Sequence, residues 1–236
     1  MSFPRYPKYK TSGVEWLGEV PEHWEVKPIR RVISQPISNG IFKKKGEFGS
    51  GVLLINVFDI YRHDFKIDFD SLDRVICDAN EVANYEVLNG DIFFVRSSLK
   101  QEGIAVVAVA DTCTEPVVFE CHLIRVRPNR KELNGRFASY ILNSFVYRSS
   151  MVARAKITTM TTIDQEAILS TKLPIPPVSE QAAIVDYLES ELSIFDTLTS
   201  EANRVIDLLK ERRTALISAA VTGQIDVRNL VSIESA

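Results

Sequence analysis

Three segments of the sequence place basic residues beside small polar residues at turn positions. They are SNGIFKKKGEFGSG at 38–51, RSSLKQEG at 96–103 and AKITTMTT at 155–162. Side chains of these types contact phosphate oxygens and base edges in nucleic acids. One such loop is more often a solvated turn, so this hypothesis needs all three loops and support from the rest of the chain. The candidates are Asn39, Lys43, Lys44, Lys45, Arg96, Ser97, Ser98, Lys100, Lys156, Thr158 and Thr159.

Motifs for catalysis are absent from the sequence. It contains no GxxxxGK[ST] loop, no GxGxxG fingerprint, no HExxH and no GxSxG, and these are the common signatures of nucleotide, metal and nucleophile sites. An acidic-x-Lys triplet of the nuclease type occurs at Asp64-Phe65-Lys66 and another at Glu25-Val26-Lys27, but no Pro-Asp dipeptide completes the pattern. We interpret both triplets as solvated surface, and a nuclease using Asp64 and Lys66 stays a distant alternative.

The cysteines and histidines predict neither a metal site nor a disulfide framework. The three cysteines form no CxxC pair, and the three histidines are scattered. Cys121 stands beside His122, but neighbouring residues of a strand face opposite sides, so core and surface roles are favoured over metal binding. The sequence shows no signal peptide and no apolar stretch of the roughly 20 residues that cross a bilayer. We therefore expect a reducing, cytoplasmic environment.

The elements that must position these loops follow from apolar patterns. Strand-length apolar runs occur at 52–60, 91–97, 104–110, 116–120 and 122–128, with turn residues between them. Helical spacing occurs at 79–88 and, more clearly, at 133–155, where Phe137, Ile141, Leu142, Phe145 and Val146 recur every three or four residues. Strands and helices without regular alternation predict an α+β domain over residues 1–172.

A long helix is predicted to follow a proline-rich linker at 173–178. In LPIPP each proline restricts the residue before it to extended geometry. Ser179 is a candidate N-cap, and no Gly or Pro occurs from there to Val221. The predicted helix over 179–222 is about 64 Å long at 1.5 Å per residue, and residues 223–236 form a tail. The chain's net charge of −3 divides unevenly, because residues 1–178 carry +2 and residues 179–222 carry −4.

The apolar positions of this helix predict a coiled-coil seam. Steps of four and three residues from Ile184 give eleven positions, of which nine are apolar. Packing of the helix on its own domain is the alternative, but a helix of this length extends beyond such a domain. Acidic residues dominate the front half and basic residues the back half, which favours antiparallel pairing, although a single helix also prefers this arrangement. The predicted interface comprises Ile184, Leu188, Phe195, Leu198, Ala202, Val205, Leu209 and Leu216.

Several segments resemble the specificity subunit of type I restriction-modification systems. The likeness is carried by SGVEWLGEVPEHWEV at 12–26, LNGDIFFVRSS at 88–98, LPIPPVSEQAAIVDYL at 173–188 and LLKERRTALISAAVTGQIDV at 208–227. The resemblance implies a target recognition domain that recognises one half of a split sequence in double-stranded DNA, and a conserved helical region that acts as spacer and docks the methyltransferase subunits. It also implies no catalysis and no cofactor on this chain, with S-adenosylmethionine on the methyltransferase partner and a restriction subunit in the full complex.

The chain departs from the family pattern in size. The usual member carries two recognition domains and two helical regions, whereas this sequence contains one of each and no repeat at a period of about 200 residues. A second chain must then supply the missing half, and we expect a homodimer on an inverted repeat. The alternatives are a decayed or regulatory half-subunit, or a coiled-coil adaptor that binds the methyltransferase subunits without recognising DNA.

Overall fold

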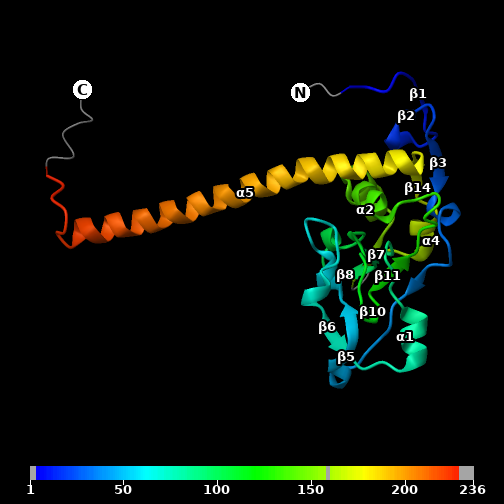
Figure 1. The fold of residues 1–236 in the computed structure, drawn as a ribbon, viewed down its shortest axis with the longest axis horizontal. Coiled ribbons are helices and arrows are strands. Elements are labelled where there is room, and N and C mark those ends of the chain that lie inside the picture. Colours follow the sequence, from blue (N-terminus) through cyan, green and yellow to red (C-terminus); the bar gives the residue numbers. More distant parts are fainter. Residues whose placement is uncertain (1–3, 158–159, 229–236) are drawn as a thin grey trace. The chain divides into compact units, whose positions relative to one another are not determined.

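The computed structural model describes residues 4–157 and 160–228 (Figure 1). The chain divides into two compact units, Met1–Val185 and Asp186–Ala236. The first is a mixed α/β domain, and most of the second is one long helix, so the predicted fold class is confirmed. Among the described residues no helix combines the length and the apolar character that a bilayer span requires.

The described strands form five small sheets, of which the largest has the order β4-β11-β7-β9. The strands are β1 (Tyr9–Thr11), β2 (Glu19–Pro21), β3 (Glu25–Pro28), β4 (Ser38–Asn39), β5 (Phe48–Ile55), β6 (Asp73–Val75), β7 (Ile92–Val95), β8 (Ser97–Ser98), β9 (Val107–Val109), β10 (Val117–Phe119), β11 (Leu123–Val126), β12 (Lys156–Ile157), β13 (Thr161–Thr162) and β14 (Lys172–Ile175). The helices are α1 (Ala79–Tyr85), α2 (Gly135–Asn143), α3 (Phe145–Val152), α4 (Gln165–Leu169) and α5 (Val178–Val221).

Strand β7 lies at the centre of the first unit and is buried on both faces. Ile92 and Phe94 belong to one hydrophobic cluster, which α2 covers with Phe137. Phe93 belongs to a second cluster, together with residues of β5 and β10. Successive side chains of a strand point to opposite faces, so this continuous apolar run supplies two cores at once.

Two predicted elements differ from the observed ones, and in the first of them local capping prevails over the apolar pattern. The run at 52–60 is a strand only to Ile55; residues Val57–Ile60 form a 3-10 helix, and the side chain of Asp59 accepts the backbone N–H of Asn56 at its start. The helical segment at 133–155 is two helices that break at Ser144. Phe145 is consequently 86% exposed, and Tyr147 and Met151 provide the buried face of α3 instead.

The predicted linker at 173–178 is wrong for its first three residues. Leu173–Ile175 belong to β14, which pairs antiparallel with β3. Leu173 is fully buried and Pro174 lies opposite Val26 in this two-stranded sheet, where a missing N–H is tolerated on an edge. The proline-rich segment is therefore part of the folded domain, and it does not form a separate linker between the domain and the helix.

Helix α5 begins at Val178, one residue before the predicted start, and its first turns belong to the first unit. Ser179 is not the N-cap, because the carbonyl of Pro177 accepts the backbone N–H groups of Glu180 and Gln181. The amide of Gln181 is fully buried; it accepts the backbone N–H of Asn134 at 2.8 Å and donates to the carbonyls of Glu132 and Pro176.

Glu180 fastens the N-terminal segment to the start of α5. Its carboxylate accepts the Tyr6 hydroxyl at 2.6 Å and the Trp24 indole N–H at 3.0 Å, and it lies 2.9 Å from the His23 ring nitrogen. Burial raises the pKa of Glu180, but the hydrogen bonds from these three side chains outweigh burial and hold the pKa below its usual value. The hydrogen bond between the Tyr6 hydroxyl and the Glu180 carboxylate is the main reason that the pKa of Tyr6 is raised to about 12.

An ion pair between Asp91 and Arg127 stabilises the turn at the start of β7. Asp91 is 0% exposed, and its two carboxylate oxygens each accept a guanidinium N–H of Arg127 at 2.7 Å. The same carboxylate accepts the backbone N–H of Leu88 at 2.8 Å, which holds the LNGD turn. Bidentate charge-assisted bonds of this kind are among the strongest in proteins.

We predict that Asp91→Ala lowers the free energy of unfolding by about 3–5 kcal/mol, because the half-buried Arg127 guanidinium loses its carboxylate partner and, among the described residues, keeps hydrogen bonds to the Glu86 carbonyl and Gln35 alone. Urea denaturation of the full chain measures this change. The matched control is Glu115→Ala, which removes an exposed pair with Arg74 and should cost less than about 1 kcal/mol. Equal decreases in the free energy of unfolding of the two variants would contradict the stabilising role of the Asp91–Arg127 pair.

We also predict that Glu180 contributes stability at neutral pH that disappears in acid. A carboxyl group whose pKa is depressed in the folded state stabilises it above the unfolded pKa, and this contribution is lost as the pH falls below about 4.3. The difference in unfolding free energy between the wild type and Glu180→Gln should be largest near pH 7 and should shrink below pH ~4.3. A constant difference across this range would refute the prediction.

Candidate nucleic-acid interface

Two of the three predicted loops converge on one small sheet. Strand β8 pairs antiparallel with β13, and β13 pairs antiparallel with β12. Thr162 lies opposite Ser97 on one side and Lys156 on the other, so segments about 60 residues apart in the sequence form one surface. This convergence brings together the RSSLK and AKITT candidates.

Backbone hydrogen bonds hold Arg96 at the edge of this sheet. Its N–H donates to the His122 carbonyl at 2.8 Å, and its carbonyl accepts the Ile163 N–H at 2.9 Å. Ser97 is buried, Arg96 and Ser98 are half-buried, and Lys100 is exposed. Arg96, Ser98 and Lys100 are therefore more accessible to a ligand than Ser97.

Lys156 extends from β12 and forms an exposed ion pair. Its ammonium lies 3.1 Å from the Asp164 carboxylate, with the two side chains 72% and 48% exposed. The pKa of Asp164 lies below its usual value, first because it accepts the backbone N–H of Ala167 and then because of Lys156. Exposed pairs of this kind are worth little, so Asp164 does little to hold the Lys156 side chain in place.

Asn39 contacts the start of α4, which follows β13 in the sequence. It lies in β4 opposite Ile124 of β11, and its side-chain oxygen accepts a hydrogen bond from the side-chain amide of Gln165 at 3.4 Å. Thr158 and Thr159, also predicted to contact DNA, lie outside the described residues.

The lysine cluster at 43–45 lies beside α1, away from this sheet. The Lys43 ammonium is 2.7 Å from Glu81 and 3.2 Å from Glu47, and its side chain is only 6% exposed. The hydrogen bond to Glu81 is the main reason that its pKa is raised. Lys43 thus holds α1 against the loop, whereas Lys44 and Lys45 are exposed.

An open groove that the sequence did not indicate lies next to β8. It has a volume of about 560 Å³ and is lined by both apolar and polar side chains, with the exposed Phe58 and Leu99 among the apolar ones. Phe58 belongs to the 3-10 helix that replaces the predicted strand at 57–60. The N-x-x-D capping pattern at Asn56 and Asp59 was the available signal for it.

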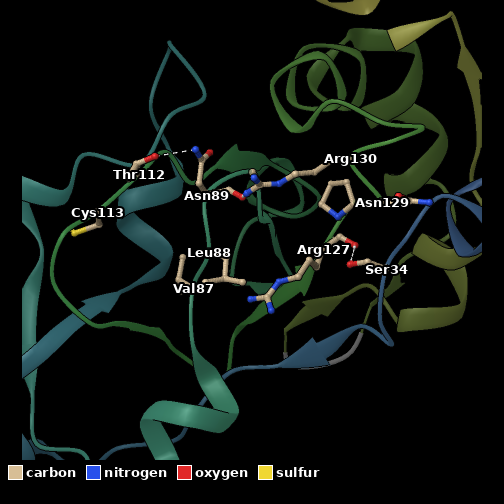
Figure 2. Close-up of a pocket in the computed structure, with 11 residues that line it drawn as sticks. Ser34, Val87, Leu88, Asn89, Thr112, Cys113, Arg127, Asn129 and Arg130 are labelled. Carbon is tan, nitrogen blue, oxygen red and sulfur yellow. Dashed lines mark hydrogen bonds between the residues drawn. The ribbon is translucent and has the colours of Figure 1, made fainter.

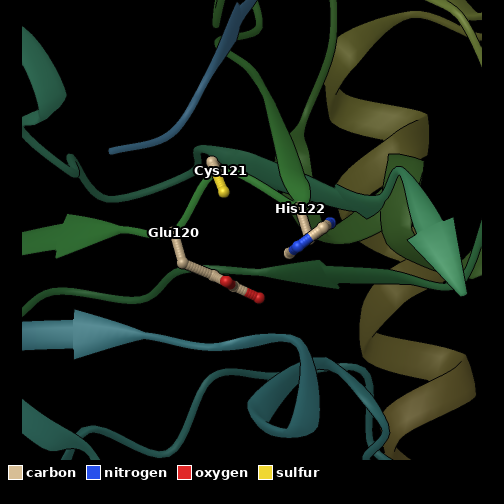
Figure 3. A group of neighbouring side chains, drawn as sticks. All are labelled: Glu120, Cys121 and His122. Carbon is tan, nitrogen blue, oxygen red and sulfur yellow. The ribbon is translucent and has the colours of Figure 1, made fainter. Parts of the chain in front are cut away.

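Glu120, Cys121 and His122 lie at the turn between β10 and β11, and their candidate ligand atoms lie within 4.8 Å of one another (Figure 3). The sequence argument that Cys121 and His122 face opposite sides of a strand is therefore wrong. Glu120 also accepts the backbone N–H of Val57 at 3.2 Å. Structural zinc sites take four ligands, and this turn supplies three, so the group does not by itself define a metal centre.

The Asp64-Phe65-Lys66 triplet forms a local turn. Asp64 accepts the backbone N–H of Lys66 at 3.2 Å and lies 3.4 Å from the Arg62 guanidinium. Asp64 therefore stabilises its own turn. These contacts give no support to the hypothesis that Asp64 and Lys66 form a nuclease site.

A second pocket, of about 580 Å³, lies against the LNGD turn (Figure 2). Arg127 and Arg130 line it, and Asn89 donates its amide to Thr112 across one wall. Arg127 is committed to Asp91, and Arg130 donates to the carbonyl of Asn89. These contacts stabilise the turn before β7, so we assign the pocket no ligand.

The apolar seam of α5 is exposed in the second unit. Every residue from 192 to 218 is exposed, including Phe195 at 59% and Leu198 at 61%. The other predicted seam residues there are exposed as well: Ala202, Val205, Leu209 and Leu216. Ile184 differs from the prediction, because it packs against the hydrophobic core of the first unit, and Leu188 is half-buried.

Comparison with known proteins supports one family. Residues 21–207 match the family model described as the type I restriction modification DNA specificity domain. The MjaX specificity subunit proposed for a type I restriction enzyme of Methanocaldococcus jannaschii is 27% identical over 208 residues, which cover 87% of this chain and 47% of that protein. The EcoKI specificity subunit of Escherichia coli K12 is 24% identical, over 88% of this chain and 44% of the relative. The chain thus spans about half the length of these relatives.

Solved structures share the fold. A structure described as the basis of complex assembly and conformational transition of the type I R-M system superposes with a TM-score of 0.66 at 18% identity, covering 90% of this chain and 48% of the other. The HsdS subunit of Thermoanaerobacter tengcongensis gives a TM-score of 0.55 at 18% identity, over 81% of this chain and 42% of that one. Since the family model matches most of the sequence, the chain belongs to the type I restriction-modification DNA specificity family.

Proposed function

We propose that this chain is the DNA specificity subunit of a type I restriction-modification complex and that its first unit contacts one half of a split target in double-stranded DNA. The observation that carries the proposal is the convergence of two basic, small-polar loops on the β12-β13-β8 sheet within the matched domain. Lys100 and Lys156 contact phosphates, and Arg96 is positioned for a base edge.

Pairing of two copies completes the target in this proposal. A two-fold protein presents the same surface to both half-sites, so the target is an inverted repeat around a gap. The support is the exposed apolar stripe of α5, which costs about 25 cal/mol per Å² while it remains in water. Antiparallel pairing also brings the acidic front of the helix, with Glu191, beside the basic back, with Arg212.

The width of the same stripe supports docking of the methyltransferase subunits. Apolar residues extend beyond the seam to both flanks, with Ile194 and Leu208 on one side and Leu192 and Ile206 on the other. A two-stranded coiled coil covers chiefly its a and d positions and leaves flanking positions charged. A stripe of this width suits further helices from a partner.

Catalysis belongs to the partners in this proposal. The methyltransferase subunit holds S-adenosylmethionine, the restriction subunit joins the full complex, and this cytoplasmic chain supplies recognition. The exposed stripe of α5 also supports the alternative of a regulatory half-subunit that binds the methyltransferase without productive DNA recognition. Binding to the methyltransferase that is insensitive to salt and independent of DNA would favour that alternative.

We predict that Lys100→Ala with Lys156→Ala weakens binding of the reconstituted complex to all DNA sequences and reduces the salt slope by about 4, since two lysines in each of two copies give four phosphate contacts and each contact releases about one counterion. Fluorescence anisotropy at several salt concentrations measures both quantities. Lys131→Ala, an exposed lysine outside the sheet, is the control and should leave the slope unchanged. An unaltered slope in the double variant would remove these residues from the interface.

We predict that Phe195→Asp with Leu198→Asp yields a folded chain that no longer dimerises, because each chain would bury two carboxylates in an apolar seam. Sedimentation measures the state, and Ser193→Asp with Ser200→Asp on the opposite helix face is the charge-matched control. In a background without native cysteines, cysteines at Glu189 and Arg212 should cross-link between chains. A dimeric double variant, or an asymmetric methylated motif with this chain as the sole specificity subunit, would overturn the pairing.

A further inference from the structure

The groove beside β8 places two large apolar side chains in solvent at the candidate interface. Phe58 is 84% exposed and Leu99 is 83% exposed, and both line the groove. Ser98 and Lys100, which flank Leu99 in the sequence, line it too. The groove is therefore continuous with the surface that we propose to contact DNA.

Hydrogen bonds hold Phe58 on a fixed backbone. The Asp59 carboxylate accepts the Asn56 N–H at 2.7 Å, and the Glu120 carboxylate accepts the Val57 N–H at 3.2 Å. The 3-10 helix that carries Phe58 is thus fastened at its first turn. An exposed aromatic side chain on an ordered backbone loses little further backbone entropy when it binds.

The loop that carries Leu99 is fixed as well. The Tyr61 hydroxyl donates to the Gly103 carbonyl at 3.0 Å, and the Gly103 N–H donates to the Lys100 carbonyl at 3.0 Å. The Arg148 guanidinium donates to the Glu102 carbonyl. A Cβ on Gly103 would lie 2.2 Å from the Ser98 hydroxyl oxygen, so only glycine allows this approach.

The charged residues of the groove indicate whether it suits the phosphates or the base edges of DNA. Glu102 and Glu120 line it together with Lys100 and His122. Carboxylates repel phosphates but tolerate base edges, which carry donors and the thymine methyl group in the major groove. An apolar surface with acidic neighbours therefore matches bases better than backbone.

Resting on the proposed function, we propose that Phe58 and Leu99 determine sequence preference by apolar contact with thymine 5-methyl groups in the major groove. The two side chains rise at the rim of an open depression about 560 Å³ in volume, which can receive a projecting methyl group. Lys100 and Lys156 supply the neighbouring phosphate contacts.

The test uses the full chain assembled with its methyltransferase subunit, on the target identified by methylation mapping. Each thymidine of the half-site is replaced in turn by deoxyuridine, which removes only the methyl group. For the wild type, one or two replacements should weaken binding about fourfold each, the value of one buried methyl group. For Phe58→Ala or Leu99→Ala, the same replacements should have no effect.

The control is Phe145→Ala, which removes an equally exposed phenylalanine outside the groove and should retain the deoxyuridine effect. The inference is overturned by a half-site without a sensitive thymidine, or by variants that weaken all sequences equally. It is also overturned if 2-aminopurine fluorescence reports unstacking without a methyl effect, or if the variants fail to assemble with the methyltransferase in the absence of DNA. Failure of the wild-type complex to distinguish target from scrambled DNA would instead refute the proposed function.

Discussion

The burial of β7 on both faces is the constraint on which the rest of the first unit depends. Its four side chains alternate between two hydrophobic clusters, one covered by α2 and the other built with β5 and β10. The bidentate pair between Asp91 and Arg127 fixes the start of this strand. Its other end leads directly into Arg96 and Ser97. A strand that is buried on both faces thus leads directly into the proposed recognition residues.

The proposed interface combines a rigid base with exposed polar and apolar side chains. Lys156 in β12 and Lys100 in the loop after β8 are the lysines proposed to contact phosphates, and the adjacent groove presents Phe58 and Leu99. Phosphate contacts supply affinity without sequence information, whereas base contacts supply specificity. A surface that separates these two kinds of contact can change its target through a few groove residues while the lysines keep their role.

Helix α5 has two parts with different physical roles. Gln181 and Glu180 fasten its first turns to the domain through buried or partly buried hydrogen bonds, from Gln181 to Pro176 and from Trp24 to Glu180 among others. From Leu192 to Ser218 the helix is exposed and retains a broad apolar stripe. Exposed apolar patches of this extent mark interaction surfaces, and the family assignment makes a second specificity domain and methyltransferase helices the natural partners to test.

The sequence by itself determined the α+β class, the long helix and the family, because each depends on local periodicity or contiguous motifs. Four-three spacing identified an apolar stripe on the helix from Phe195 to Leu216, whose pairing stays a prediction, and the apolar run at 91–97 predicted the strand that is β7. Only the tertiary structure decided which loops meet. It joined Ser97 to Thr162 and Lys156 through non-local pairing, and it committed Lys43 to Glu81. It also turned the run at 57–60 into a 3-10 helix that exposes Phe58, and it placed Pro174 in a strand. These outcomes depend on partners far away in the sequence, or on capping bonds that compete with apolar pattern, and local patterns carry no information about which partner is present.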